Sequence, residues 1–199
     1  MTPRGRTVST REQRKNLLIL GEGESEHIYF KGLRSRYSHM NIISQNGKGG
    51  GSYDNMITTI KKSANRQGLD VHNGDILAIV ADVDEHSADD VIAAKEKCNE
   101  GGIEFYISNI DFEVWLLLHY EAITKWFEKD ELIERLSKHL GKPYEKSEGI
   151  SADDDVIDEA VKRGMKEIPC DEDAVEICLR GDRSRTTVHL LVNKLSDYV

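Results

Sequence analysis

Acidic side chains follow two apolar runs of this sequence, and their types and spacing suit the binding of a divalent cation. Glu22 comes shortly after the run at 17–20, and Asp82 and Asp84 follow the run at 76–81. Short apolar runs bounded by turn residues are typical of strands buried on both faces, and open α/β sheets bind ligands at the carboxyl ends of such strands. Asp82 and Asp84 would point the same way on an extended segment, so they could converge with Glu22 on one cation.

Carboxylate oxygens are preferred ligands of hard cations such as Mg²⁺, and Mn²⁺ accepts the same ligands. A Glu after one strand and an Asp-x-Asp after another could hold such a cation and leave positions open for water and phosphate. Acidic residues at strand ends are also common as helix caps and in solvated turns. The spacing alone leaves both interpretations open.

A further carboxylate, Glu113, lies in the otherwise apolar run at 112–118, which predicts a helical turn. Its neighbours three and four positions on are Leu116 and Leu117, so it faces an apolar surface. A buried carboxylate without a partner is costly, so Glu113 needs a cation, an Arg or a backbone donor. Glu113 is therefore either a structural group or a further site carboxylate. Glu26 is similar, although the first turn of a helix favours an acid in any case.

Apolar runs and helical patterns alternate over the first half of the chain. Strands are predicted at 17–20, 40–44, 75–81 and 103–108, with helices at 25–36, 53–67 and 88–99. This alternation predicts a parallel sheet with right-handed crossovers, flanked by helices, as in Rossmann-like α/β folds.

The pattern changes after residue 109. Helical segments follow through residue 140, then a polar linker at 141–151 and helices at 153–168 and 186–198. The predicted organisation is a basic arm at 1–15, an α/β core at 16–120 and an α-helical region at 121–199.

The net charge of −9 excludes a diffuse attraction for nucleic acid. A nucleic acid partner would have to be bound by metal ions or by a few cations in specific places. The candidates outside the N-terminal arm are Lys48, Arg180, Arg183 and Arg185.

Each of these cations has two interpretations. Lys48 lies in the glycine-rich loop at 47–52, which lacks P-loop spacing but could cradle a phosphate with its amides, or could be a solvent loop. The three arginines could clamp substrate phosphates or pair with the acidic residues at 153–155.

Neither a membrane nor an oxidising compartment is indicated. No apolar run approaches the length of a membrane span, and residues 2–15 lack the apolar core of a secretory signal. The three cysteines lie far apart and form no CxxC pair, which favours reduced thiols in the cytoplasm.

Four segments resemble the motifs of RloB-like proteins, in the right order and over nearly the whole chain. The most specific is the Phe-Glu-x-Trp-Leu-Leu-Leu-His string at 112–119. The motif-bearing segments are 18–30, 81–86, 108–119 and 186–189. Two departures stand out: Gly21 replaces a Cys or small residue before the Glu, and Ile110-Asp111 replaces a Pro-containing pair.

The resemblance implies a Toprim-type fold and phosphoryl transfer on nucleic acid, DNA or RNA, most simply metal-assisted phosphodiester hydrolysis. By the same resemblance, Glu22 would be a general acid/base or a metal ligand, and Asp82 and Asp84 would hold Mg²⁺. RloB-like genes accompany phage-resistance loci, often beside an ATPase, which implies a nuclease of anti-phage defence with an ATPase partner. The alternative is a non-catalytic phosphate- or nucleotide-binding subunit of such a complex.

Overall fold

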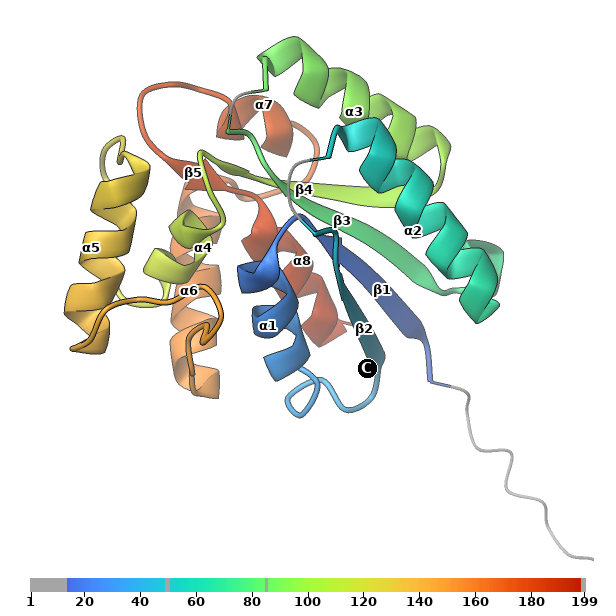
Figure 1. Ribbon diagram of the computed structural model, residues 1–199, viewed down its shortest axis with the longest axis horizontal. Coiled ribbons are helices and arrows are strands. Elements are labelled where there is room, and N and C mark those ends of the chain that lie inside the picture. The colour runs from blue at the N-terminus through green and yellow to red at the C-terminus, as the bar shows by residue number, and fades with distance from the viewer. Residues whose placement is uncertain (1–13, 49–50, 85, 198–199) are drawn as a thin grey trace, which may run out of the picture.

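The computed structural model describes residues 14–48, 51–84 and 86–197, and its elements alternate as in an α/β fold (Figure 1). The strands are β1 (Asn16–Gly21), β2 (Asn41–Asn46), β3 (Ile76–Asp82), β4 (Ile103–Asn109) and β5 (Arg185–Thr186). The helices are α1 (Glu24–Gly32), α2 (Tyr53–Gln67), the short 3-10 helix η1 (Val71–Asn73), α3 (Ala88–Glu100), α4 (Glu113–Leu118), α5 (Lys129–Leu140), α6 (Asp154–Glu167), α7 (Ala174–Cys178) and α8 (Val188–Asp197).

The five strands form one sheet in the order β2-β1-β3-β4-β5. The first four strands run parallel, so their carboxyl ends lie along one edge. Register fixes which residues meet there: Gly21 pairs with Val80, and Asp82 pairs with Ser108. The predicted α/β class with a mostly parallel sheet is confirmed.

Helices cover both faces of the sheet, which is why its central strands β1 and β3 are largely apolar. On one face, α2 and α3 pack together against β1, β3 and β4. On the other face, α1 packs against β2 and α8 against β4, and α4–α6 lie beyond these two helices, as Figure 1 shows. Every residue of β1 after Asn16 is buried, and so are the five residues before Asp82 in β3. The sheet is therefore a rigid platform for residues at its carboxyl edge.

The end of the chain differs from its predicted helix at 186–198. Arg185 and Thr186 form β5, which pairs antiparallel with Ser108 and Asn109, and the helix begins at Val188. Thr187 also donates its backbone N–H to Ile107. A two-residue strand of polar residues has no hydrophobic periodicity, so the pattern could not reveal it.

Smaller differences concern element ends and one added helix. Helix α1 ends at Gly32, four residues before its predicted end, and α7 lies in a segment where no helix is predicted. Within the described part of the chain, no helix has the length and apolar character needed to cross a membrane. The basic arm lies outside the described residues except for 14 and 15.

Candidate active site

The carboxyl ends of β1, β3 and β4 bring five acidic side chains together. We call this group the acid cluster: Glu22, Glu26, Asp82, Asp111 and Glu113. Its first two members follow β1, the third ends β3, and the last two follow β4. Glu22 is joined directly to β3, because its Oε2 accepts a hydrogen bond of 3.1 Å from the backbone N–H of Asp82. The predicted placement of these two residues at one edge of the sheet is what the structure has.

Glu26 enters the cluster because Gly21, at the end of β1, carries no side chain. A Cβ atom on Gly21 would lie only 2.5 Å from the Cβ of Glu26, so the first turn of α1 can approach the end of β1 only over glycine. Glu26 is 3% exposed. Burial raises its pKa to about 7, with a further upward contribution from the charges of Glu113 and Glu22. A carboxyl group with this pKa can hold or release a proton near neutral pH.

Asp82 lies at the centre of the cluster and lacks a full set of partners. Its Oδ1 is buried and has no hydrogen-bond partner. Burial, followed by the charges of Asp111 and Glu26, holds the pKa of Asp82 well above the usual range of an aspartate. A buried carboxylate oxygen without a donor is costly, and a bound cation would satisfy it.

Asp111 is almost fully buried and lies between other charged groups of the site. Burial alone would raise its pKa, but hydrogen bonding with Asp82 and Glu113 and the charges of Lys146 and Lys129 lower the pKa below the usual value. The surroundings of Asp111 therefore stabilise its charged form, in contrast to those of Glu26, Asp82 and Glu113.

Glu113 is 1% exposed and is held by one side chain from α1 and one from the segment between α5 and α6. Its Oε1 accepts hydrogen bonds of 3.0 Å from Ser25 and from the hydroxyl of Tyr144. Its Oε2 is buried without a partner. Burial, with the charge of Asp111, raises the pKa of Glu113. The sequence-based alternatives for this residue were a structural group and a site carboxylate, and its position among the other acids favours the second.

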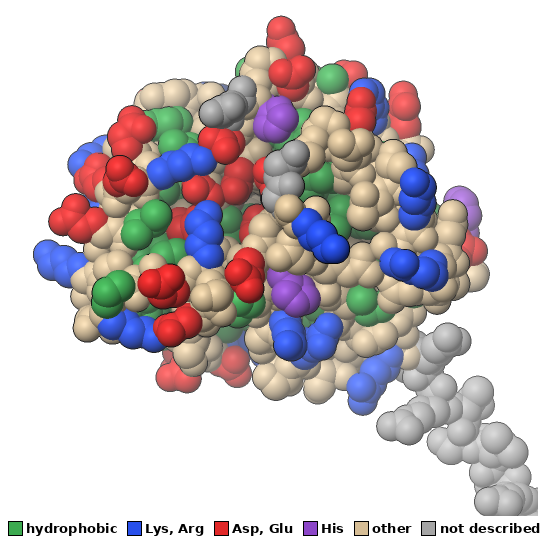
Figure 2. Space-filling model, viewed as in Figure 1, with side chains coloured by type: hydrophobic (Ala, Val, Ile, Leu, Met, Phe, Trp, Pro, Cys, Tyr) green, Lys and Arg blue, Asp and Glu red, His purple; other side chains and the backbone are tan. Residues whose placement is uncertain are grey.

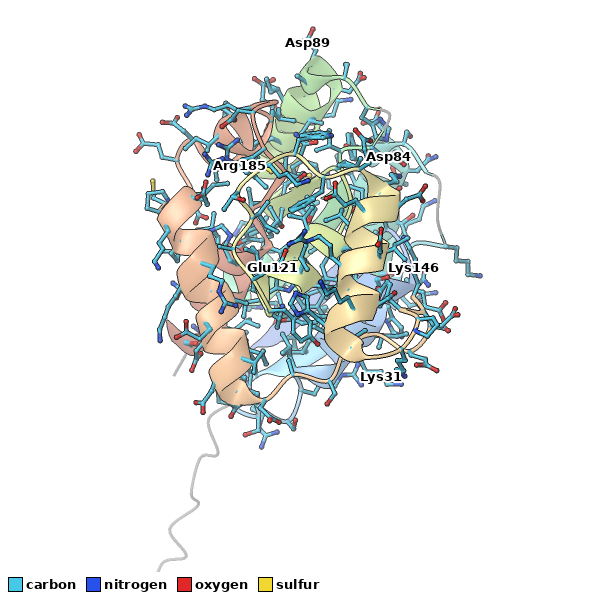
Figure 3. The ribbon with its side chains drawn as sticks, turned by 90° about the vertical axis from the view of Figure 1, so that its left-hand side faces the viewer. Lys31, Asp84, Asp89, Glu121, Lys146 and Arg185 are labelled. Carbon is cyan, nitrogen blue, oxygen red and sulfur yellow. The ribbon has the colours of Figure 1, made fainter. Side chains whose placement is uncertain are left out.

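Asp84 lies beside the acid cluster, but its carboxylate pairs with Lys129 and does not join the other acids. Its backbone has a φ of 39°, so the chain has left the extended conformation in which Asp82 and Asp84 would point the same way. The carboxylate of Asp84 is 2.8 Å from the ammonium group of Lys129. Figure 3 shows Asp84 and Lys146 beside α5, which stands with α6 in front of the sheet.

Metal binding depends on how these side chains converge and on which atoms they offer. As they stand, no three acidic, histidine or cysteine side chains in the described ranges converge closely enough to hold a metal ion. The donor set nevertheless has the right chemistry, because it consists of carboxylate oxygens and two of these, Asp82 Oδ1 and Glu113 Oε2, are buried without partners. Asp82, together with Glu22 or Asp111, carries the carboxylate oxygens that would hold such a cation.

The predicted phosphate-binding cations lie outside the acid cluster. Lys48 is exposed and has a φ of 69°. Arg183 forms an ion pair of 3.2 Å with Glu167, and the 8% exposed Arg185 forms one of 2.6 Å with Asp182. Arg180 is exposed, and its carbonyl oxygen accepts a hydrogen bond from Arg185.

The acidic start of α6 has a different partner from the one considered in the sequence. Arg36 forms ion pairs with Asp154 and Asp158, at 2.7 and 2.5 Å. The three C-terminal arginines are thus not the counter-charges of residues 153–155. Figure 2 shows acidic and basic side chains interspersed over the helical part of the visible face, on the left, with no extended area of one sign.

Three residues at the site were not singled out in the sequence: Asp111, Lys129 and Lys146. Asp111 lies two residues before Glu113 in the most specific motif region, which was an available signal. The two lysines come from α5 and from the linker after it, and only the tertiary packing of that linker brings them to the sheet edge. No spacing in the sequence indicates such a contact.

Comparison with models of known protein families places the chain. The family model described as RloB-like protein matches residues 17–195, which is most of the chain. Neither the curated proteins nor the solved structures gave a match.

Proposed function

The chain belongs to the RloB-like family, and we propose that it is a Toprim-type nuclease that hydrolyses phosphodiester bonds with the help of Mg²⁺ or Mn²⁺. The observation that carries this proposal is the set of buried carboxylates from three neighbouring strand ends, with Asp82 Oδ1 and Glu113 Oε2 left without partners. Such a set is costly in a purely structural role, and it suits a site that is completed by a cation.

Each residue has a distinct part in this proposal. Asp82 and Asp111 would hold the cation, and Glu22 would act as a ligand or as the acid/base, oriented by its hydrogen bond from the Asp82 amide. When bound, the cation would polarise a phosphate oxygen and lower the pKa of a bound water. Glu113 would keep the cluster negative, and Lys129, 40% exposed, could contact a substrate phosphate. Asp84 would then join the cation only after leaving Lys129.

The test is cleavage by the purified full chain. The protein is incubated with labelled single-stranded DNA, duplex DNA, RNA and tRNA, with Mg²⁺, Mn²⁺ or a chelator. We expect cation-dependent cleavage of one of these substrates, and a loss of at least about 100-fold in Asp82→Asn and Glu113→Gln.

The matched control is Asp89→Asn, which removes one acidic charge from the exposed start of α3. It should cleave at the wild-type rate. Equal activity of Asp82→Asn and Asp89→Asn, or cleavage that survives the chelator, would contradict the proposal.

A specific observation favours the alternative function, a non-catalytic phosphate- or nucleotide-binding subunit. Lys129 and Lys146 of the C-terminal region reach the acid cluster and partly cover it. A protein of this kind would bind nucleotides or nucleic acid with unchanged affinity in Asp82→Asn and would cleave none of the substrates. The same panel of substrates therefore separates the two functions.

The wider setting is also a proposal. We place the protein in the cytoplasm, in anti-phage defence, with nucleic acid as substrate and an ATPase as partner protein. Co-expression with a candidate ATPase partner, followed by co-purification and by the same cleavage assay, tests this setting. An ATPase that neither co-purifies nor changes the activity would contradict it.

A further inference from the structure

A lysine from the C-terminal region lies among the carboxylates of the acid cluster. Lys146 belongs to the segment between α5 and α6. This segment, residues 141–153, contains the polar linker predicted at 141–151, and we call all of it the linker. Its Nζ lies 3.7 Å from Asp111 Oδ1 and 3.5 Å from Glu113 Oε1. It brings one positive charge to a group of acids that the sequence places far from it.

The contacts of Lys146 are loose. Both distances exceed the usual length of a hydrogen bond between an ammonium group and a carboxylate, about 2.7–2.9 Å. The side chain is 51% exposed, and Glu113 keeps one buried oxygen without a partner. Lys146 thus supplies a positive charge without a short hydrogen bond to either carboxylate, and its half-exposed side chain can turn towards solvent.

The linker is tied to the acid cluster at a second point. The hydroxyl of Tyr144 donates to Glu113 Oε1, and its backbone N–H donates to Ser137 at the end of α5. The Tyr144 hydroxyl also lies 3.0 Å from the Ser25 hydroxyl. A change in the charge or position of the Asp111 and Glu113 carboxylates will therefore alter the contacts that Tyr144 and Lys146 make from the linker.

We propose that Lys146 is an internal counter-ion of the acid cluster, and that a divalent cation displaces it. The inference rests on the proposed function for the nature of the competing ion. An ammonium group and a divalent cation repel each other when they share carboxylates, so each weakens the binding of the other. Cation binding is then coupled to the release of Lys146 and of the linker around it.

The test measures cation affinity in the full chain without nucleic acid. Lys146→Met removes the charge and keeps a long apolar stem. By titration calorimetry with Mn²⁺, this variant should bind the cation at least about threefold more tightly than the wild type, as expected for a partly exposed ion pair. Lys146→Arg, which keeps the charge, should retain the wild-type affinity.

The matched control lies in the same linker. Lys142→Met also removes an exposed charge, but Lys142 pairs with Glu148 within the linker. Its cation affinity should equal that of the wild type. A merely structural role of Lys146 would leave the affinity unchanged or reduce it, and either result would overturn the inference.

Hydrogen exchange provides a second readout. In the wild type, peptides covering residues 141–153 should exchange faster when Mn²⁺ is added. In Lys146→Met they should exchange fast already and change little with Mn²⁺. Cation binding by the wild type with an unaltered linker overturns the inference and leaves the proposed function standing. Absence of cation binding in both the wild type and Lys146→Met overturns both.

Discussion

The carboxylate of Glu22 accepts a hydrogen bond from the backbone N–H of Asp82. The bond joins the carboxyl ends of the neighbouring strands β1 and β3. This contact fixes Glu22 relative to the backbone of Asp82 and leaves the Asp82 side chain free of it. The Asp82 carboxylate in turn has an unpartnered oxygen and several acidic neighbours. The side chain of Glu22 is thus positioned by the backbone of β3, whereas the carboxyl group of Asp82 keeps a buried oxygen without a partner.

The first prediction concerns the stability of Asp82→Asn. Repulsion among the acids destabilises the cation-free protein, so the substitution should leave its free energy of unfolding unchanged or raise it. The stabilisation that Mn²⁺ confers should become smaller. Thermal unfolding with and without Mn²⁺ measures both effects. A cation-free loss of more than about 2 kcal/mol would instead identify Asp82 as a structural hydrogen-bond acceptor.

The second prediction concerns the partners of Glu113. Tyr144→Phe removes one of two hydroxyl donors to a carboxylate that is almost fully buried. The free energy of unfolding should fall by about 1–3 kcal/mol, because a buried acceptor loses a bond that water does not replace. Urea denaturation measures the change.

Tyr120→Phe is the control for this substitution, since Tyr120 is only partly buried and stacks on His139. Its cost should stay below about 0.5 kcal/mol. Equal losses in the two variants would show that the bond from Tyr144 to Glu113 does not stabilise the fold.

Much of the fold could be predicted because burial on both faces produces continuous apolar runs. The strands β1 and β3 follow directly from such runs, and their carboxyl ends placed Glu22 and Asp82 on one edge. β5 could not be predicted, because its two residues are held by pairing with Ser108 and Asn109 and carry no pattern of their own.

The site was predicted only in part. One reason is a local backbone conformation, and the other is packing between segments far apart in the sequence. Locally, Asp84 has a positive φ, which breaks the alternation from which its direction was inferred. At a distance, Lys129 and Lys146 reach the cluster through the packing of α5 and its linker, and a single sequence does not encode that contact as a spacing. Glu113 could be found because a lone acid in a buried apolar run is costly and therefore needs a specific partner.

The third prediction concerns the pH dependence of stability through His119. Its Nδ1 lies 3.0 Å from the carbonyl oxygen of Trp115, so Nδ1 carries the proton and Nε2 accepts from the hydroxyl of Tyr29. Burial lowers the pKa of His119 to about 4, although hydrogen bonds to the Trp115 backbone act in the opposite direction.

The direction of the pH dependence follows from the number of protons that His119 binds in the folded and unfolded states. Between pH 6.5, the ordinary value for histidine, and pH 4, the unfolded chain binds more protons at this residue than the folded one. The stability that depends on neutral His119 is therefore complete above about pH 6.5 and decreases as the pH falls towards about 4. From pH 7.5 to 5 the loss should be about 2 kcal/mol.

Comparison with His119→Gln isolates this effect from that of other titrating groups. The free energy of unfolding is measured by urea at pH 7.5 and pH 5 for both proteins. The variant starts from a lower stability, but its decrease between the two pH values should be smaller than that of the wild type by about 2 kcal/mol. Identical decreases would show that His119 is not held neutral in the fold.

The last prediction concerns how an acidic protein binds the phosphates of a substrate. Arg180 and Arg183 were predicted to contact them. Arg185 is set aside because this buried side chain forms an ion pair with the exposed Asp182. In Arg180→Gln/Arg183→Gln, duplex DNA binding should weaken, and the slope of log affinity against log salt should flatten by about two, close to one for each lost phosphate contact. Fluorescence anisotropy at several salt concentrations measures both quantities.

The control is Arg66→Gln, in the last turn of α2 at the opposite edge of the sheet. It changes the net charge in the same direction without touching the strand ends that carry the acid cluster. Its salt slope should equal that of the wild type. If the double variant also keeps the wild-type slope, Arg183 serves only its ion pair with Glu167. Substrate phosphates would then be held by other cations, such as Lys129, which lies beside Asp84 and Asp111.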